Sequence, residues 1–346
     1  MNQEGKRNVR KNIIPKKKKK KKISFKLLLG FIVFQIFFTA ITAPFVLLYG
    51  PFENAKKTFL GTAYDSMHYQ WLATTFMSDE RIREILGRNE EASTATEIPE
   101  EDLVEIPKVK DDSIKYYTIE GTDGAKFNGY VIEVADATRV KVGVSSKLGI
   151  QGEKTSKIAK NNKAIAAING GAFTDDPNGE AWTQNGGIPT GLIMMDGEEK
   201  FNNITALDQK NATAIITKTG ILRAGNYSIN EIREMGDASE ALTFGPVLIS
   251  GGVKVSSLPE TGTSPKTLLG QKKDGTMVLV VLDSNTETRM CANIREAQNV
   301  MYNLGCVTAI NLDGGKSTTM YYDGDVVNNP SNDTGERTIA SGFIVK

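Results

Sequence analysis

The chain has 346 residues, with 42 basic and 41 acidic side chains, two cysteines and a single histidine. Twelve basic residues but one acidic residue fall within residues 1–26, so the remainder has 30 basic and 40 acidic side chains, a net charge of about −10. A charge of this sign argues against nucleic-acid binding, which needs a basic surface. The single histidine, His68, argues against a zinc site built from several histidines and against a Ser-His-Asp triad.

The first 49 residues predict a membrane anchor. Residues 1–26 form a basic tail with seven consecutive lysines, Lys16–Lys22, and residues 27–49 contain no charged side chain. A helix of that length can cross a bilayer of about 30 Å. A cleavable signal peptide is the closer alternative and a buried core helix is another, but the apolar segment is longer than the roughly 7–15 residues of a signal peptide. We therefore expect an uncleaved single-pass anchor, with the tail in the cytoplasm and the C-terminal domain outside the cell.

Residues 50–112 are expected to form a helical stalk followed by an acidic linker. Ser78 is a suitable N-cap for a short helix that ends near Gly87. His68 lies in this stalk, and we interpret it as a surface or interfacial residue. Residues 89–112 are rich in acidic side chains and contain two prolines and no aromatic residue, a composition typical of linkers.

Residues 113–346 are predicted to form one domain of the α+β class, with a largely antiparallel or mixed β-sheet core and about three helices. The helices are expected near residues 154–161, 229–235 and 293–304. Short apolar runs bounded by Gly, Asn or Asp predict strands at residues 116–119, 130–134, 140–144, 164–168, 192–195, 214–216, 247–249, 277–282, 307–312, 318–322 and 343–345. A doubly wound fold would instead need regular alternation of strands and helices.

The segment between the two cysteines predicts a helix. Asn293 and Glu296 form a capping pair, apolar residues follow at helical spacing, and Gly305 suits the C-terminal end. A helix of this length separates Cys291 from Cys306 by about 20 Å, which is beyond the reach of a disulfide. We therefore expect two unpaired, mostly buried thiols.

Residues 315–317, Gly-Lys-Ser, match the end of a nucleotide-binding phosphate loop. That motif needs a glycine five residues before Gly315, where this chain has Ile310, and it must open a helix. The residues that follow are β-branched and aromatic, and Asp323-Gly324 is a hairpin-turn signal. The expected context is therefore strand–loop–strand, which argues against a nucleotide site.

Four polar, glycine-rich segments follow apolar runs, at residues 168–179, 244–252, 311–320 and 328–343. Each alone could be an ordinary turn. Their combination and order resemble the phosphodiester glycosidase family from about residue 160 to the C-terminus, most clearly in the last forty residues. The resemblance rests on Asn169-Gly170-Gly171-Ala172-Phe173, Gly245-Pro246, Asn311-Leu312-Asp313-Gly314-Gly315 with Ser317, and Asn329-Pro330 with Arg337.

The resemblance implies hydrolysis of the bond between a sugar C1 and a phosphate oxygen. If the C1–O bond breaks, the leaving group is a phosphate monoester with a pKa of about 6, and a cation that holds it can do much of the work of a general acid. The implied catalytic residues are Asp313, as a carboxylate near C1, and Arg337, as a phosphate clamp. The alternatives are a turn-forming role for Asp313 and a structural ion pair of Arg337 with Glu336 or another acid.

The resemblance also implies a set of substrate-binding candidates: Asn169, Gly170, Gly171, Lys266, Asn311, Gly314, Gly315, Lys316 and Ser317. The two asparagines could hydrogen-bond sugar hydroxyls or the carboxylate, and the alternative is a structural role at the strand ends. Two of the candidates depart from the family pattern. Lys266 stands where arginine is usual and lacks its bidentate fork, and Lys316 stands where the family often has a small residue. The motifs establish no cofactor, but Asp175 and Asp176, which could also be a plain loop, could bind a divalent cation such as Ca²⁺.

Taken together, these features favour an extracytoplasmic, membrane-anchored hydrolase of a sugar-1-phosphodiester in cell-envelope or exopolysaccharide metabolism. Its expected partners are a glycosyl-phosphate or polysaccharide substrate and the membrane, not nucleic acid, and the sequence does not indicate an oligomeric state. The alternative is a non-catalytic polysaccharide-binding or envelope-assembly protein on the same fold, since a fold can lose its chemistry. A nuclease or phospholipase would need metal-binding histidines and acidic clusters that we do not find in the sequence.

Overall fold

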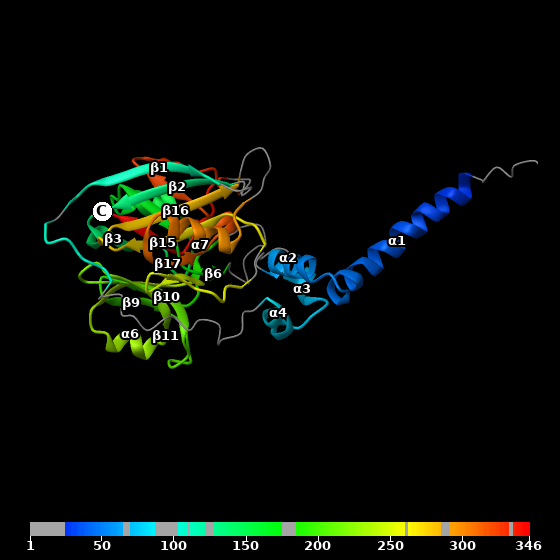
Figure 1. Ribbon diagram of the computed structural model, residues 1–346, viewed down its shortest axis with the longest axis horizontal. Helices are drawn as coiled ribbons and strands as arrows, with labels where there is room; N and C mark the ends of the chain where they lie inside the picture. The colour runs from blue at the N-terminus through cyan, green and yellow to red at the C-terminus, as the bar shows by residue number, and fades with distance from the viewer. Residues whose placement is uncertain are drawn as a thin grey trace, which may run out of the picture. The chain divides into compact units, whose positions relative to one another are not determined.

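The computed structural model describes residues 25–64, 70–86, 103–109, 111–121, 127–174, 185–259, 262–284, 291–331 and 335–346. The chain divides into two compact units, residues 1–56 and 57–346. In the first unit, α1 (Phe25–Tyr49) is apolar, and its segment Leu28–Tyr49 has the length and composition of a membrane span (Figure 1). Large apolar side chains such as Phe37 and Ile41 are exposed along it. A core helix would bury them, so α1 is a candidate single-pass anchor or signal sequence.

The described residues between α1 and β1 form three further helices: α2 (Glu53–Tyr64), α3 (Gln70–Thr74) and α4 (Asp79–Ile85). The predicted cap of α4 is confirmed, because the Ser78 side chain accepts a hydrogen bond from the Arg81 main-chain N–H at 3.3 Å. His68 and most of the predicted linker lie outside the described residues.

Most strands belong to three large antiparallel sheets. The first, the seven-stranded sheet, has the order β1-β2-β16-β15-β17-β13-β14. Its strands are β1 (Ile114–Glu120), β2 (Phe127–Val134), β16 (Met277–Ser284), β15 (Lys266–Lys272), β17 (Cys306–Leu312), β13 (Val247–Ser250) and β14 (Val253–Lys254). Because β15 lies antiparallel between β16 and β17, those two strands end at the edge where β15 begins.

The other two large sheets have five strands each. The β5 sheet contains, in order, β19 (Asp325–Val326), β18 (Met320–Tyr322), β5 (Ala166–Asn169), β21 (Ser341–Val345) and β3 (Val140–Val144). The β10 sheet contains β11 (Leu222–Tyr227), β10 (Asn211–Thr217), β12 (Ala238–Thr243), β8 (Leu192–Met195) and β9 (Glu198–Asn202). Two small pairs complete the described strands: β20 (Thr338–Ile339) with β4 (Glu153–Lys154), and β6 (Phe173–Thr174) with β7 (Ile188–Pro189).

The inner faces of the three large sheets meet in one hydrophobic core. Leu279 and Ile310 enter it from the seven-stranded sheet, Phe343 from the β5 sheet, and Ile216 and Leu242 from the β10 sheet. Side chains alternate between the two faces of a strand, so each sheet also has an apolar outer face that needs a cover.

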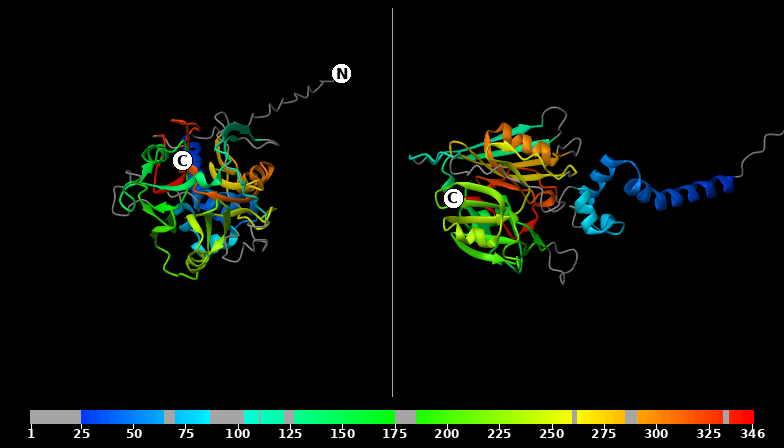
Figure 2. Two further views of the ribbon diagram at one scale, coloured as in Figure 1. Left: turned by 90° about the vertical axis from the view of Figure 1, so that its left-hand side faces the viewer. Right: turned by 60° about the horizontal axis from the view of Figure 1, so that its bottom comes forward.

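One helix covers the outer face of each large sheet. These helices are α5 (Thr155–Asn161), α6 (Ile229–Glu234) and α7 (Ile294–Asn303). Met301 of α7 packs on the seven-stranded sheet, Ile232 of α6 on the β10 sheet and Ile158 of α5 on the β5 sheet. Figures 1 and 2 show α6 and α7 on the outside of the sheets that they cover. The three predicted helices and the α+β class are thus confirmed.

The helix between the cysteines begins with the predicted capping box. The side chains of Asn293 and Glu296 each accept a hydrogen bond from the other residue's main-chain N–H. Gly305 follows the helix with φ +86°, a conformation that favours glycine. Cys291 and Cys306 are both free and buried, as expected. Burial raises the pKa of the Cys306 thiol to about 12.

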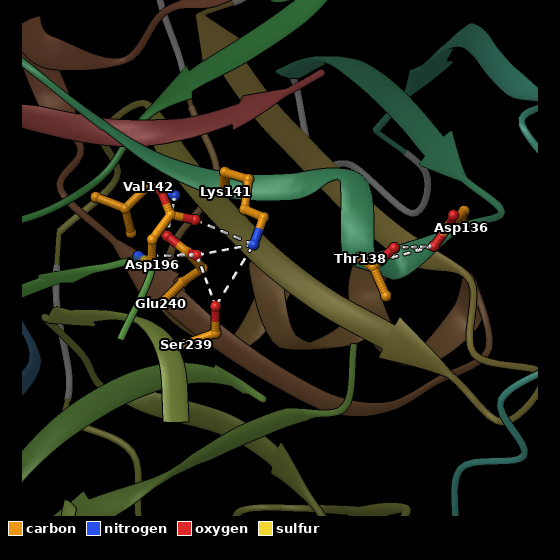
Figure 3. A network of polar contacts seen from close by, with 7 residues as sticks. All are labelled: Asp136, Thr138, Lys141, Val142, Asp196, Ser239 and Glu240. Atoms are coloured by element: carbon orange, nitrogen blue, oxygen red, sulfur yellow. Dashed lines mark hydrogen bonds and ion pairs between the residues drawn. The ribbon is translucent and has the colours of Figure 1, made fainter. Parts of the chain in front are cut away.

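A buried carboxylate joins the β5 sheet to the β10 sheet (Figure 3). Glu240 of β12 is fully buried and accepts hydrogen bonds from Val142 N at 2.8 Å, Lys141 Nζ at 3.1 Å and Asp196 N at 3.2 Å. Val142 and Lys141 belong to β3, the edge strand of the β5 sheet. The carboxylate therefore takes the place of a neighbouring strand along that edge and satisfies a main-chain N–H that would otherwise be buried without a partner.

Candidate active site

The four glycine-rich segments meet at one edge of the fold. Asp313, just after β17, donates its main-chain N–H to Gly170 O at 3.0 Å, and Gly170 N donates to Ser341 O at 3.1 Å. Asn311 Nδ2 donates to Gly245 O at 2.9 Å. These bonds connect all four segments, which the sequence alone could only place at the ends of separate strands.

Asp313 is the half-buried carboxylate at the centre of this meeting point. Desolvation raises its pKa from 3.8 to about 6, against the lowering effects of a Ser317 hydrogen bond, the Arg337 charge and the Gly314 main-chain N–H. Loss of water therefore outweighs a hydrogen-bonded and electrostatically favourable setting. A carboxyl group whose pKa is raised toward neutral pH in this way is typical of acid–base and nucleophilic sites.

The loop after Asp313 is a short 3-10 turn, Gly315–Ser317, and β18 follows it. A side chain at Gly314 would place its Cβ 2.6 Å from Pro265 O, and Gly315 has φ +60°. Both positions therefore require glycine. Lys316 is exposed. The turn opens no α-helix, which agrees with the argument against a nucleotide-binding loop.

Arg337 is buried beside this loop, with 6% of its surface exposed. Its guanidinium carbon lies 5.0 Å from the centre of the Phe173 ring, and its charge lowers the pKa of Asp313. The carboxylate of the neighbouring Glu336 accepts hydrogen bonds from Ser156 N at 2.8 Å and Ser156 Oγ at 2.5 Å. Arg337 is thus placed on the face of an aromatic ring and near the candidate carboxylate.

Asn169 holds the Asp313 loop from inside the protein. It is fully buried, and its Nδ2 donates to Asp313 O at 2.6 Å. Its Oδ1 accepts from Thr267 Oγ1 at 2.7 Å and from Thr319 N at 3.0 Å. The amide makes three protein contacts, so the structure gives Asn169 a supporting position behind the loop.

The remaining substrate-binding candidates lie around the same edge. A Cβ on Gly170 would lie 2.7 Å from Leu242 Cδ1, and one on Gly171 would lie 2.7 Å from Ser341 Oγ, so both glycines permit close packing. Lys266 is buried, and its Nζ donates to Ser264 O at 3.0 Å and to Ser264 Oγ at 2.5 Å. Its ammonium group therefore makes hydrogen bonds within the protein.

Asn311 presents a buried acceptor at this edge, because its Oδ1 has no hydrogen-bond partner among the described residues. Asp175 and Asp176, the metal candidates, lie outside the part of the chain that the structure describes. In the described ranges, no group of three or more His, Cys, Asp or Glu residues is placed to hold a metal ion. The metal assignment therefore stays a prediction from sequence.

Another buried carboxylate, which the sequence patterns above do not single out, lies at the end of β16. Asp283 is 2% exposed, and burial raises its pKa although Asn329 N, Ser284 N and the Asn328 side chain donate to it. Its sequence signal is the same as that of Asp313: an aspartate directly after a run of apolar strand residues, here residues 277–282. This sequence pattern therefore marks Asp283 as well as Asp313.

Comparison with known proteins identifies relatives of the part of the chain that carries these segments. A model of the phosphodiester glycosidase family matches residues 162–346. N-acetylglucosamine-1-phosphodiester alpha-N-acetylglucosaminidase from Bos taurus is 28% identical over 184 residues, which cover 46% of this chain and 34% of the relative. The Homo sapiens protein of the same name is 29% identical over 172 residues, which cover 44% of this chain and 33% of the relative. An uncharacterized SPbeta prophage-derived protein of Bacillus subtilis is 24% identical over 187 residues, which cover 52% of this chain and 27% of that protein.

The chain thus spans about a third or less of the length of these curated relatives. Among solved structures, the catalytic domain of the zebrafish N-acetylglucosamine-1-phosphodiester alpha-N-acetylglucosaminidase, auto-inhibited by its pro-peptide, has the same fold. Its TM-score is 0.55 at 24% identity, over 73% of this chain and 86% of that one. The family match covers more than half of the chain, and the protein therefore belongs to the phosphodiester glycosidase family.

Proposed function

We propose that this protein hydrolyses glycosyl phosphodiesters, with Asp313 and Arg337 as its catalytic residues. The observation that carries the proposal is the setting of Asp313: a carboxylate with a pKa of about 6, next to the Arg337 charge, where the four family segments meet. Family membership supports the reaction class. The names of the mammalian relatives make an N-acetylglucosamine-1-phosphodiester the first substrate to test.

The chemistry follows from the leaving group. The bond between sugar C1 and the phosphate oxygen breaks, both electrons leave with the phosphate monoester, and the oxygen of water becomes bonded to C1. A phosphate monoester has a pKa of about 6, so it departs without the strong general acid that an alkoxide needs. The Arg337 guanidinium supplies the positive charge that stabilises the departing phosphate.

Asp313 acts in its ionised form in this scheme. A carboxylate beside C1 stabilises the positive charge that develops on the sugar, and the same group can attack C1 or accept the proton of the incoming water. Attack by the carboxylate forms a covalent glycosyl-enzyme intermediate, and its hydrolysis by water gives overall retention of anomeric configuration, whereas direct attack by water on the substrate inverts it. All three roles require that the carboxyl group has lost its proton.

We further propose that the reaction takes place outside the cytoplasm, on a glycosyl phosphate of the cell envelope or of an exopolysaccharide. Two observations support this location: α1 is a candidate single-pass anchor or signal sequence, and 12 basic residues lie within residues 1–26. Positively charged flanks stay in the cytoplasm, so the domain that carries Asp313 would face outward. Protease treatment of intact cells should then digest the C-terminal domain, and full protection of the domain would contradict the location.

The activity test uses the full chain purified in detergent. It is incubated with an α-N-acetylglucosamine-1-phosphodiester and a panel of other glycosyl phosphodiesters, and release of free sugar is measured. Asp313→Asn and Arg337→Ala are each expected to lower kcat by about 10²-fold or more. Asp237→Asn and Arg233→Ala, which alter ion pairs elsewhere in the described residues, are matched controls that should retain activity.

Two results would count against the proposal. Full activity in Asp313→Asn or Arg337→Ala would remove the assigned roles. Saturable binding of a glycopolymer without turnover by the wild-type chain would favour the alternative, a non-catalytic polysaccharide-binding protein on this fold.

A further inference from the structure

Asp283 is a buried carboxylate for which the proposed reaction has no direct use. Both of its oxygens accept hydrogen bonds: Oδ1 from Ser284 N at 2.9 Å, and Oδ2 from Asn329 N at 2.6 Å and Asn328 Nδ2 at 3.2 Å. Every one of these partners is an N–H donor. An asparagine at this position would have to turn its own NH₂ toward one of them, so the site is built for a carboxylate.

The Asn328 side chain connects Asp283 to the loop that follows Asp313. Asn328 is 8% exposed, and its Oδ1 accepts from Met320 N at 2.8 Å. Its Nδ2 donates to Thr318 O at 3.2 Å as well as to Asp283. One amide therefore fixes both main-chain groups where the loop enters β18.

The same segment reaches the middle of the loop. Ser331 Oγ lies 3.3 Å from Gly315 O, to which it donates. At the other end, the main chain of Asp313 is held by Gly170 O and Asn169 Nδ2. The loop that carries Ser317, whose side chain hydrogen-bonds the Asp313 carboxylate, is thus fixed at its start by β5 and at its end through Asp283.

We infer that Asp283 is a positioning residue for the reaction: it anchors the Asn328 side chain, which holds the loop that presents Asp313 and Ser317. The inference rests on the proposed function for its kinetic consequence, but the structural link can be measured without substrate. A displaced catalytic group lowers kcat steeply even when the substrate still binds, so the effect should fall on kcat more than on KM.

The experiment compares three variants of the full chain: Asp283→Asn, Asn328→Ala and, as a control, Glu240→Gln. Glu240 is also a buried carboxylate that accepts main-chain N–H groups, but its partners belong to β3 and to the turn after β8. Hydrogen exchange measured by mass spectrometry reports on peptides that contain residues 314–320. Steady-state kinetics on the best substrate of the panel report kcat and KM.

Exchange in residues 314–320 should become at least about tenfold faster in Asp283→Asn and in Asn328→Ala, while Glu240→Gln should change it little and should affect β3 instead. In the same two variants kcat should fall at least about tenfold, with KM within about threefold of wild type. If Asp283→Asn does not fold, Asn328→Ala decides, because it removes the same link and leaves the carboxylate in place.

Unchanged loop exchange in a folded variant, or an increase spread evenly over all strands, would overturn the inference. So would a rise in KM at unchanged kcat. A wild-type chain that cleaves no member of the panel would defeat the proposed function instead, and the exchange data alone would still decide whether Asp283 holds the loop.

Discussion

Asn169 Nδ2 donates to the main-chain oxygen of Asp313 at 2.6 Å, across 144 positions of the chain. This one bond joins the end of β5 to the end of β17, which belong to different sheets. The position of the candidate carboxylate is therefore set by the packing of two sheets and not by its own loop alone. Two further carboxylates that matter for stability are the half-buried Asp313 and the fully buried Glu240.

Replacement of Asn169 by aspartate should destabilise the protein. The change removes the donor to Asp313 O and places a carboxylate oxygen against that carbonyl, in a fully buried position. We expect the free energy of unfolding to fall by roughly 2–4 kcal/mol, measured by denaturant unfolding at pH 7. Asn299→Asp, at an exposed position on α7, is the control and should shift the unfolding midpoint little. Equal stability of the two variants would mean that the bond does not hold the loop.

The pH dependence of kcat/KM should report Asp313 of the free enzyme. Its pKa is about 6 and the ionised form is required, so kcat/KM should rise as pH increases through about 6 and level off above it. The Arg337 charge lowers this pKa, and Arg337→Gln should therefore shift the rise to higher pH as well as lower the plateau. A profile that falls over this range would assign Asp313 the role of a proton donor instead.

The stability of the protein should depend on the same group with a defined sign. The pKa of Asp313 is raised above its unfolded value of 3.8, so its contribution is favourable below about pH 4 and is lost as pH rises toward 6. At pH 8 the folded protein therefore holds an ionised, poorly solvated Asp313 carboxylate, which costs stability. Asp313→Asn removes this cost and should raise the free energy of unfolding at pH 8 by about 1–3 kcal/mol, with little gain at pH 3.5.

Asp237 provides a control of opposite sign for that measurement. Its pKa is lowered, first by the hydrogen bond from Arg223. Asp237→Asn should therefore lower stability at pH 8, where Asp313→Asn raises it. If both variants shift the unfolding midpoint in the same direction, the burial of Asp313 does not carry the assigned cost.

Much of the fold follows from local sequence patterns, and the strands that these patterns do not predict have a physical explanation. Each of the eleven predicted strand regions contains at least part of a strand. Most of these strands are buried on both faces, where a run of apolar residues is the expected signal, although β1 has no fully buried residue. The apolar runs did not predict β9, β11, β12 or β15, although the family resemblance implied a strand that begins at the position of β15. In β12 and β15, polar side chains interrupt the apolar run. Glu240 in β12 and Gln271 in β15 are fully buried, and their partners, such as Val142 N and Gly220 O, come from distant parts of the chain.

The site was predictable to a similar extent. The strand-end position of Asp313 and the four segments follow from the sequence, but which segments touch depends on sheet pairing that no local pattern specifies. Asn169 illustrates the difference: its motif left open a substrate contact or a structural role at the strand end, and its buried amide makes three contacts within the protein. Asp283 shows the converse, since its role depends on Asn328 and Asn329, about 45 residues later.

The Glu240 network should contribute to stability but not to the reaction. Glu240→Gln leaves Lys141 without its buried counterion and turns an NH₂ group toward one of the N–H donors, so unfolding should become easier by roughly 2–4 kcal/mol. Glu198→Gln, at an exposed ion pair on β9, is the control and should leave the unfolding midpoint unchanged. A Glu240 variant as stable as wild type would show that the two sheets do not depend on this contact.

The central claim is that the bond between sugar C1 and oxygen breaks, with Asp313 and Arg337 acting on opposite sides of it. Hydrolysis of a glycosyl phosphodiester in ¹⁸O-labelled water, followed by mass spectrometry of the released phosphate monoester, tests this directly. The account predicts turnover that depends on Asp313 and a phosphate product without ¹⁸O, since the water oxygen goes to the sugar. Incorporation of ¹⁸O into the phosphate would show that the phosphorus–oxygen bond breaks, and would contradict the account.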